Sequence, residues 1–160
     1  MAAEVLIGIS RQTLQLLEGG KVVGRWPVST SRYGPGELTD SMGTPRGRHR
    51  IRACIGDGQP SGAVFVGRRA TGEIYSEELA SQHPGRDWVL SRILWLCGEL
   101  PGYNRHGRVD SMRRYIYIHG TPDSEPMGVP RSHGCVRMRN ADVIALFDRV
   151  GPGCRVDIQP

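Results

Sequence analysis

The sequence predicts a mainly β fold in a single domain, residues 1–160, with one helix near the C-terminus. The chain holds 22 glycines and 11 prolines in 160 residues, and both residue types favour turns over long helices. Short apolar runs rich in β-branched and aromatic residues recur between these turns. A chain of this length can bury one core and is short for two ordinary domains, so we expect one domain.

The first half of the chain predicts a meander of short strands. Gly19-Gly20 lies between two apolar-rich runs and can supply the positive φ angles of a tight hairpin. The predicted strands cover residues 5–10, 13–18, 21–29 and, after a Gly- and Pro-rich loop over 32–47, residues 48–53.

The middle of the chain, residues 56–110, carries weaker patterns. Residues 63–67 and 88–96 predict two strands, and residues 74–80 predict a short helical turn.

The last third predicts a strand, a loop, a helix and a final strand. Residues 115–118 form an aromatic and β-branched strand that ends at His119-Gly120. Asn140 is the expected N-cap of the helix, with Asp142 in its first turn complementing the helix dipole. The helix presents Val143, Ile144, Phe147 and Val150 to the core, ends at Gly151-Pro152-Gly153, and is followed by a strand over 154–158.

Charge and composition limit the classes of partner. The net charge of +5 suits an anionic substrate, but the basic residues are too scattered to predict nucleic-acid binding. No apolar run is long enough to cross a bilayer, and the N-terminus lacks the pattern of a signal peptide. We therefore expect no membrane insertion and a cytoplasmic location, or a periplasmic one if a signal segment has been removed.

Four cysteines occur at wide spacing without a CxxC motif, which favours reduced thiols. Cys135 stands out among them, because it directly follows Gly134 and precedes the predicted helix, whose positive end favours a thiolate. Amide groups in such a turn can also receive an oxyanion. His119 at a strand end can act as the base, with the Gly120 carbonyl fixing its tautomer, and His133 is the other candidate. The pattern predicts a cysteine nucleophile for acyl transfer.

A zinc site made by His119, His133 and Cys135 is an alternative for the same residues. It lacks a convincing fourth ligand and a glutamate placed as base, so we favour a site without metal.

These residues also resemble a known family. The sequence is similar to the signature of the L,D-transpeptidase catalytic domain, or YkuD domain, in Ile118-His119-Gly120, a Pro- and Gly-rich spacer, and Ser132-His133-Gly134-Cys135-Val136-Arg137. Gly43-Thr44-Pro45-Arg46-Gly47 ahead of a strand also fits the family. One departure is Arg46-Gly47-Arg48-His49, where many members have Thr-Gly-x-Phe or Thr-Gly-x-Tyr, and this change is expected to alter a pocket wall.

The resemblance implies a β-sandwich or barrel-like fold and action on the stem peptides of peptidoglycan, with no cofactor. It implies that Cys135 attacks the carbonyl before the terminal D-Ala and that His119, oriented by Gly120, moves the proton. The loop of Ser132, His133 and Gly134 would hold the oxyanion, and Arg137 would steady that loop or bind a substrate carboxylate. Carbapenem-type inhibitors are expected to acylate Cys135.

Two questions remain open at the level of sequence. Water as acceptor would make an L,D-carboxypeptidase that trims muropeptides, as in family members without export signals, and this is the expectation we favour. An amine acceptor would make a transpeptidase that forms 3→3 cross-links. A non-catalytic module that binds the cell wall is the alternative from another class, although the intact Cys135 and His119 argue against it.

Overall fold

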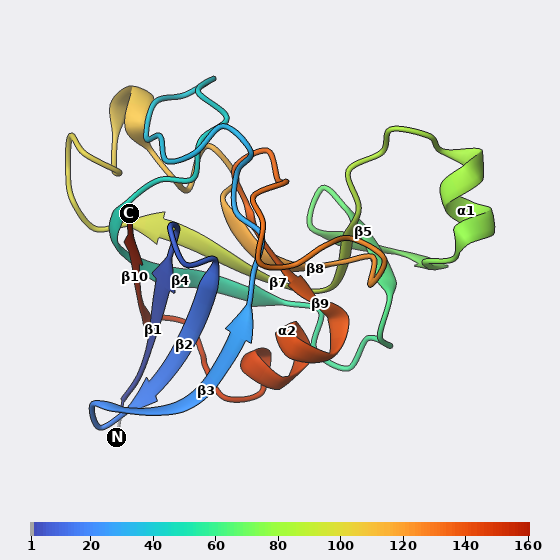
Figure 1. Cartoon of the computed structure of the whole chain (residues 1–160), viewed down its shortest axis with the longest axis horizontal. Helices are drawn as coiled ribbons and strands as arrows, with labels where there is room; N and C mark the ends of the chain where they lie inside the picture. Colours follow the sequence, from blue (N-terminus) through green and yellow to red (C-terminus); the bar gives the residue numbers. More distant parts are fainter. Residues whose placement is uncertain (1) are drawn as a thin grey trace.

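Ten strands form one curled sheet with one main helix packed against it in the computed structural model, which describes residues 2–160 (Figure 1). The strands are β1 (Ala3–Gly8), β2 (Thr13–Glu18), β3 (Lys21–Pro27), β4 (Gly47–Ile55), β5 (Ala63–Val66), β6 (Arg69–Ile74), β7 (Val89–Gly98), β8 (Tyr117–Thr121), β9 (Val136–Arg139) and β10 (Arg155–Gln159). The helices are α1 (Glu77–Gln82), α2 (Asn140–Phe147) and a 3₁₀ turn at Gly107–Val109. The prediction of a mainly β fold is confirmed.

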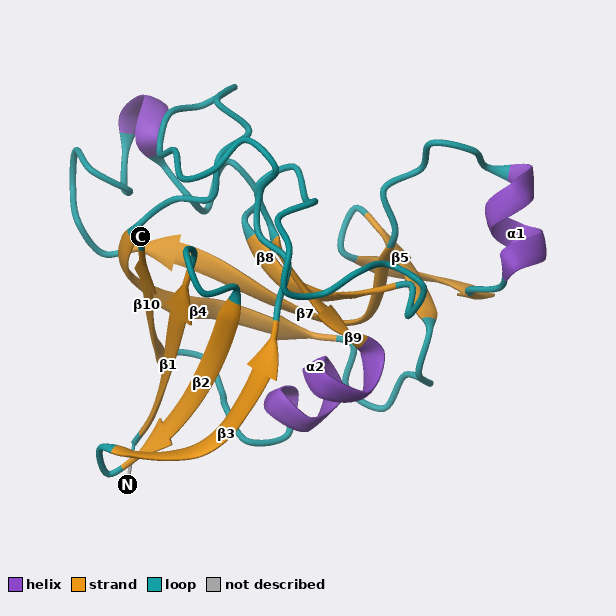
Figure 2. Cartoon of the chain, in the orientation of Figure 1, coloured by secondary structure: helices purple, strands orange, loops and turns teal. Residues whose placement is uncertain are grey.

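The order of the strands places the first and the last strand side by side. The sheet runs β3-β2-β1-β10-β4-β7-β5-β6, and β8 pairs with both β7 and β9. The last strand, β10, lies parallel to β1 and antiparallel to β4. Long loops gather at one end of the sheet, whereas α1 stands away from its body (Figure 2).

The main core lies between the inner face of the sheet and α2. Alternate residues of the N-terminal strands enter it, as the period of two in a strand requires, and Val5 and Leu14 are fully buried there. From α2, Val143, Leu146 and Phe147 pack against β7, β8 and β9. A smaller cluster on the other side of β7 contains Phe65, Ile93 and Tyr117, and Cys135 packs against it.

Most predicted elements are found, with instructive exceptions. The hairpin at Gly19-Gly20 joins β2 to β3, and the helical turn is found as α1, which begins three residues later than predicted. Strand β6 was not predicted, because it is a mostly exposed edge strand without apolar alternation. Strand β9 was not predicted either, so the expectation that Cys135 directly precedes a helix is wrong.

The predicted cap of α2 is wrong as well. Arg139 occupies the N-cap position without a side-chain cap, and Asn140 is the first residue of the helix. The Asn140 amide is instead drawn inward, where its Nδ2 donates to the Thr121 carbonyl (3.0 Å) and to Asp123 Oδ1 (3.2 Å). The helix ends at Phe147, so Val150 lies beyond it but still packs against the core.

No helix within residues 2–160 combines the length and apolarity that crossing a bilayer requires.

Candidate active site

Two neighbouring parallel strands bring Cys135 and His119 to one region of the sheet. Strands β8 and β9 pair with Ile118 opposite Val136 and His119 opposite Arg137. Cys135 directly precedes β9 and lies beside Tyr117, whose side chain shares a face of β8 with that of His119 because side chains alternate along a strand. His119 therefore lies within β8, and the prediction that it ends the strand is wrong.

The Cys135 thiol is held by two backbone groups. Tyr117 N donates to Sγ at 3.3 Å, and Sγ donates to the Tyr115 carbonyl at 3.4 Å. Burial raises the pKa of the Cys135 thiol to about 12, an effect that the Tyr117 amide and the nearby Arg137 and Arg114 only partly offset. The thiol is consequently protonated at neutral pH, and β9 separates it from the start of α2.

The His119 imidazole is buried, with only 1% of its surface exposed. Its Nδ1 lies 2.7 Å from the Gly120 carbonyl oxygen, which can only accept a hydrogen bond. The proton therefore sits on Nδ1, and Nε2 keeps a lone pair. Burial lowers the pKa of His119 below 6.5, so the ring is a neutral base at neutral pH.

Gly120 has no room for a side chain. A Cβ placed there would lie 2.5 Å from the Leu90 carbonyl oxygen and 2.7 Å from Asn140 Oδ1. The glycine thus allows β7 and the start of α2 to close on β8, which fixes the carbonyl that orients His119.

The loop before Cys135 is shaped by a left-handed glycine and two hydroxyls. Gly134 has a φ of +131°, in the region that favours glycine. Its amide donates to Ser132 Oγ (3.2 Å), and Ser132 Oγ also bonds the Cys135 carbonyl. Thr44 Oγ1 donates to the Gly134 carbonyl at 2.9 Å, which ties this loop to the predicted Gly-Thr-Pro segment.

Residues 2–158 match the model of the YkuD family, which is described as "L,D-transpeptidase catalytic domain". The chain belongs to this family. The resemblance inferred from the two motifs is confirmed.

The relatives of this L,D-transpeptidase domain are longer proteins. "Putative L,D-transpeptidase YkuD" of Bacillus licheniformis is 26% identical over 157 residues, which is 98% of this chain and 65% of the relative. "Probable L,D-transpeptidase YbiS" of Escherichia coli K12 is 49% identical over 43 residues, or 27% of this chain and 14% of that protein. The solved structure of L,D-transpeptidase LdtMt1 in complex with imipenem superposes with a TM-score of 0.57 at 18% identity, covering 98% of this chain and 58% of the other, and so shares the fold.

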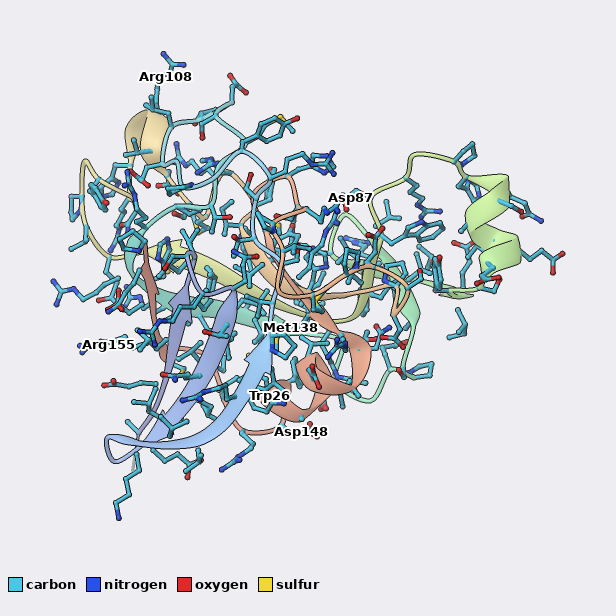
Figure 3. The ribbon with its side chains drawn as sticks, viewed as in Figure 1. Trp26, Asp87, Arg108, Met138, Asp148 and Arg155 are labelled. Carbon is cyan, nitrogen blue, oxygen red and sulfur yellow. The ribbon has the colours of Figure 1, made fainter. Side chains whose placement is uncertain are left out.

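Asp87, which the sequence analysis did not select, joins the two basic residues of this L,D-transpeptidase site. Its Oδ1 accepts from Arg137 Nη2 at 2.9 Å, and its Oδ2 lies 3.6 Å from His133 Nδ1. Asp87, labelled in Figure 3, lies on the segment that leads from α1 back to the sheet. Arg137 is only 6% exposed, and its Nε has no hydrogen-bond partner within residues 2–160. Fifty residues separate Asp87 from Arg137, so no local pattern could have paired them.

A basic hollow of about 440 Å³ adjoins this ion pair. It lies between the segment around α1 and the loop before Cys135, and its lining includes Arg32, Tyr75, Trp88, Arg131, His133 and Arg137. The excess of arginine makes the hollow suited to an anionic ligand.

Arg114 is a second residue that the sequence analysis missed. Its guanidinium donates to the carbonyls of Gly36 (3.0 Å), Glu37 (3.3 Å) and Gly43 (2.7 Å), so it clamps the 32–47 loop beside Cys135. His49 is fully buried and bonds Gly47 O and Ser111 Oγ, so the prediction that the departing segment alters a pocket wall is wrong for His49. Arg46, from the same segment, lines a surface hollow together with Glu37 and Tyr103.

The zinc alternative finds no support in the arrangement of side chains. Across residues 2–160, no three His, Cys, Asp or Glu side chains converge in a way that could hold a metal ion. The four cysteines are unpaired in the same range.

Proposed function

We propose that this chain is a cysteine-dependent L,D-carboxypeptidase that cleaves the bond before the terminal D-Ala of peptidoglycan stem tetrapeptides. The observation that carries the proposal is a neutral imidazole, fixed by the Gly120 carbonyl, on the sheet face that also holds a partly buried thiol. A nucleophile, a base and an orienting group are the three parts that acyl transfer by cysteine needs.

The proposed reaction proceeds in two steps. Cys135 Sγ attacks the carbonyl of the L-centre of the third residue while His119 Nε2 takes the thiol proton. The C–N bond then breaks, the proton passes to the departing amine of D-Ala, and a thioester remains on Cys135. Water gives a proton to His119 and attacks the thioester, after which the tripeptide leaves and the thiol regains its proton.

The order of proton transfer follows from burial. A thiolate paired with an imidazolium would place two charges in a site that raises the pKa of Cys135 and lowers that of His119. We therefore assign a neutral resting pair, in which the proton moves as the substrate carbonyl arrives and Sγ leaves the Tyr115 carbonyl.

We assign the oxyanion to amides of the loop of His133, Gly134 and Cys135. The Gly134 amide is engaged by Ser132 before substrate arrives, so the other two amides are the first donors in this assignment. The ion pair with Asp87 supports a loop-steadying role for Arg137, and its unpartnered Nε supports a contact with substrate at the basic hollow.

Two observations support water as the acceptor. Four unpaired cysteines suit a reducing compartment, where free muropeptides are trimmed rather than cross-linked. The arginine-rich hollow suits a small peptide with several carboxylates. The names of the relatives favour the second candidate, a transpeptidase that forms 3→3 cross-links.

The test is mass spectrometry of a stem tetrapeptide incubated with the protein, with a second stem peptide present as a possible acceptor. We expect tripeptide and free D-Ala, and a loss of at least about 10³-fold in rate for C135S. The control C97S should keep the wild-type rate, since Cys97 lies near the end of β7 and lines a hollow that contains neither Cys135 nor His119.

Other products would decide against the proposal. A joined peptide dimer would replace water by an amine acceptor, and bound but uncleaved peptide would indicate a binding module. Intact mass after incubation with imipenem should show an adduct on Cys135 that C135S lacks.

A further inference from the structure

Arg68 has a backbone conformation that is unfavourable for arginine. It is the second residue of the two-residue turn Gly67-Arg68 between β5 and β6, where Val66 pairs with Arg69. Both turn residues have positive φ, 56° and 64°, as in a type I′ turn that favours Asn and Gly. Arginine in a left-handed conformation costs about 1–2 kcal/mol relative to glycine. A residue with this strain is a candidate for a functional role of its side chain.

The Arg68 side chain lies on an aromatic shelf, which we define as Trp95, Tyr115 and Tyr117. Its Cζ is 4.7 Å from the centre of the Trp95 ring and 5.0 Å from that of Tyr115. Its Nη1 donates to Tyr117 Oη at 3.1 Å. Tyr115 also has a positive φ of 56°, so two left-handed residues meet at this shelf.

The shelf is directly connected to the nucleophile. The Tyr117 amide and the Tyr115 carbonyl are the two groups that hold Cys135 Sγ. The same two residues therefore position the thiol on one side and the guanidinium on the other.

The guanidinium is available to a ligand. No carboxylate of residues 2–160 forms an ion pair with Arg68, and only one of its five N–H groups has a hydrogen-bond partner in that range. Stacking on rings holds the planar fork in place while it leaves the edge for a bidentate carboxylate.

We propose that Arg68 forms a carboxylate subsite for the donor peptide, beside Cys135 and distinct from the hollow at Arg137. The inference rests on the proposed function, because the ligand is a carboxylate of the stem tetrapeptide. Two carboxylates of such a peptide are candidates: that of the terminal D-Ala, and that on the side chain of a diamino acid at the third position.

Matched peptides and matched variants test the subsite. Three tetrapeptides are compared: the free acid, the C-terminal amide, and the amide of the third-residue side chain. The variant R68N suits a left-handed turn and so preserves the fold, and R68K keeps the charge without the planar fork. Arg69 is exposed and next in sequence, so R69N is the control for charge.

We expect R68N to raise KM for the free acid about 10-fold with kcat within twofold, R68K to restore part of the loss, and R69N to leave KM unchanged. For one of the two amidated peptides, R68N should leave KM unchanged. The group that is amidated in that peptide is the carboxylate that Arg68 binds. Equal KM effects of R68N on all three peptides, or no effect on any, would overturn the subsite.

A binding measurement separates this proposal from the proposed function. Calorimetric titration of the three peptides into C135A and into C135A/R68N needs no turnover. If the wild type fails to cleave the free acid, the proposed function is wrong. The subsite is tested separately, because it requires that R68N weakens binding of the free acid to the C135A protein. Equal affinities of the two proteins for the free acid would overturn it.

Discussion

Burial acts on the two reacting residues in opposite directions. It lowers the pKa of His119 and raises that of Cys135, so both groups are neutral over a wide range of pH. Since the base must be neutral to accept a proton, activity is lost only as pH falls through the lowered pKa of His119.

We therefore expect the acidic limb of kcat/KM to have its midpoint below pH 6.5, the ordinary pKa of histidine. Asp87 raises the pKa of His119 and Arg137 lowers it, so D87N should move this limb to still lower pH. Rates of D-Ala release from pH 4 to 9 measure the shift. The exposed residue Asp57 gives the control D57N, which should keep the wild-type limb. A midpoint above 6.5, or an upward shift in D87N, would contradict the assignment of His119 as base.

The residues of the site differ in how far the sequence reveals them. Cys135 and its flanking glycine and histidine form one contiguous motif, and His119-Gly120 forms another. Asp87 and Arg114 carry no such signal, because Asp87 is 50 residues from Arg137 and Arg114 is at least 71 residues from the carbonyls that it binds. Their roles depend on the three-dimensional arrangement of loops that pattern analysis does not provide.

At the scale of elements, the site depends on the β8–β9 pair and on the loop that closes over it. Val136 and Met138, both buried in the structure, are alternating apolar residues in the sequence. A run of only four residues between a turn and a helix was too short to predict a strand. The 32–47 loop, in contrast, was predicted correctly as irregular, and its position is set by Arg114.

Replacing Arg114 tests this clamp. R114M keeps the length of the side chain but removes donors to three carbonyls of the loop, so we expect a loss of about 2–4 kcal/mol in unfolding free energy. The loop should also become a site of early proteolysis, and activity should fall because Thr44 no longer holds the Gly134 carbonyl in place. The neighbouring Arg113 is exposed, which makes R113M the matched control. Urea unfolding and limited proteolysis provide the measurements, and equal behaviour of the two variants would show that the clamp does not position the loop.

At the scale of the whole molecule, the last strand joins the two halves of the sheet. Strand β10 lies between β1 and β4, so the N-terminal meander β1–β3 reaches the rest of the sheet through a strand that is distant from it in the sequence. The sequence predicted this strand but not its neighbours, because a parallel pairing of the two chain ends leaves no local pattern.

Deleting residues 155–160 should therefore abolish cooperative folding. The deletion removes Val156 and Ile158 from the main core, each contributing about 1.5–3 kcal/mol, and leaves β1 and β4 as unpaired edges. The burial energy of the two side chains, together with the lost hydrogen bonds of β10 to β1 and β4, approaches the total unfolding free energy of about 5–15 kcal/mol expected for a domain. The control replaces α1 (Glu77–Gln82), which has no buried residue, by a Gly-Ser linker of equal length. The control should retain a cooperative thermal transition by circular dichroism, because the main core does not include α1. A cooperative transition in the protein lacking residues 155–160 would mean that β4–β9 and α2 form a folding unit independent of the N-terminal meander. In that case the pairing of β10 with β1 and β4 would be needed to position the site and not to fold the domain.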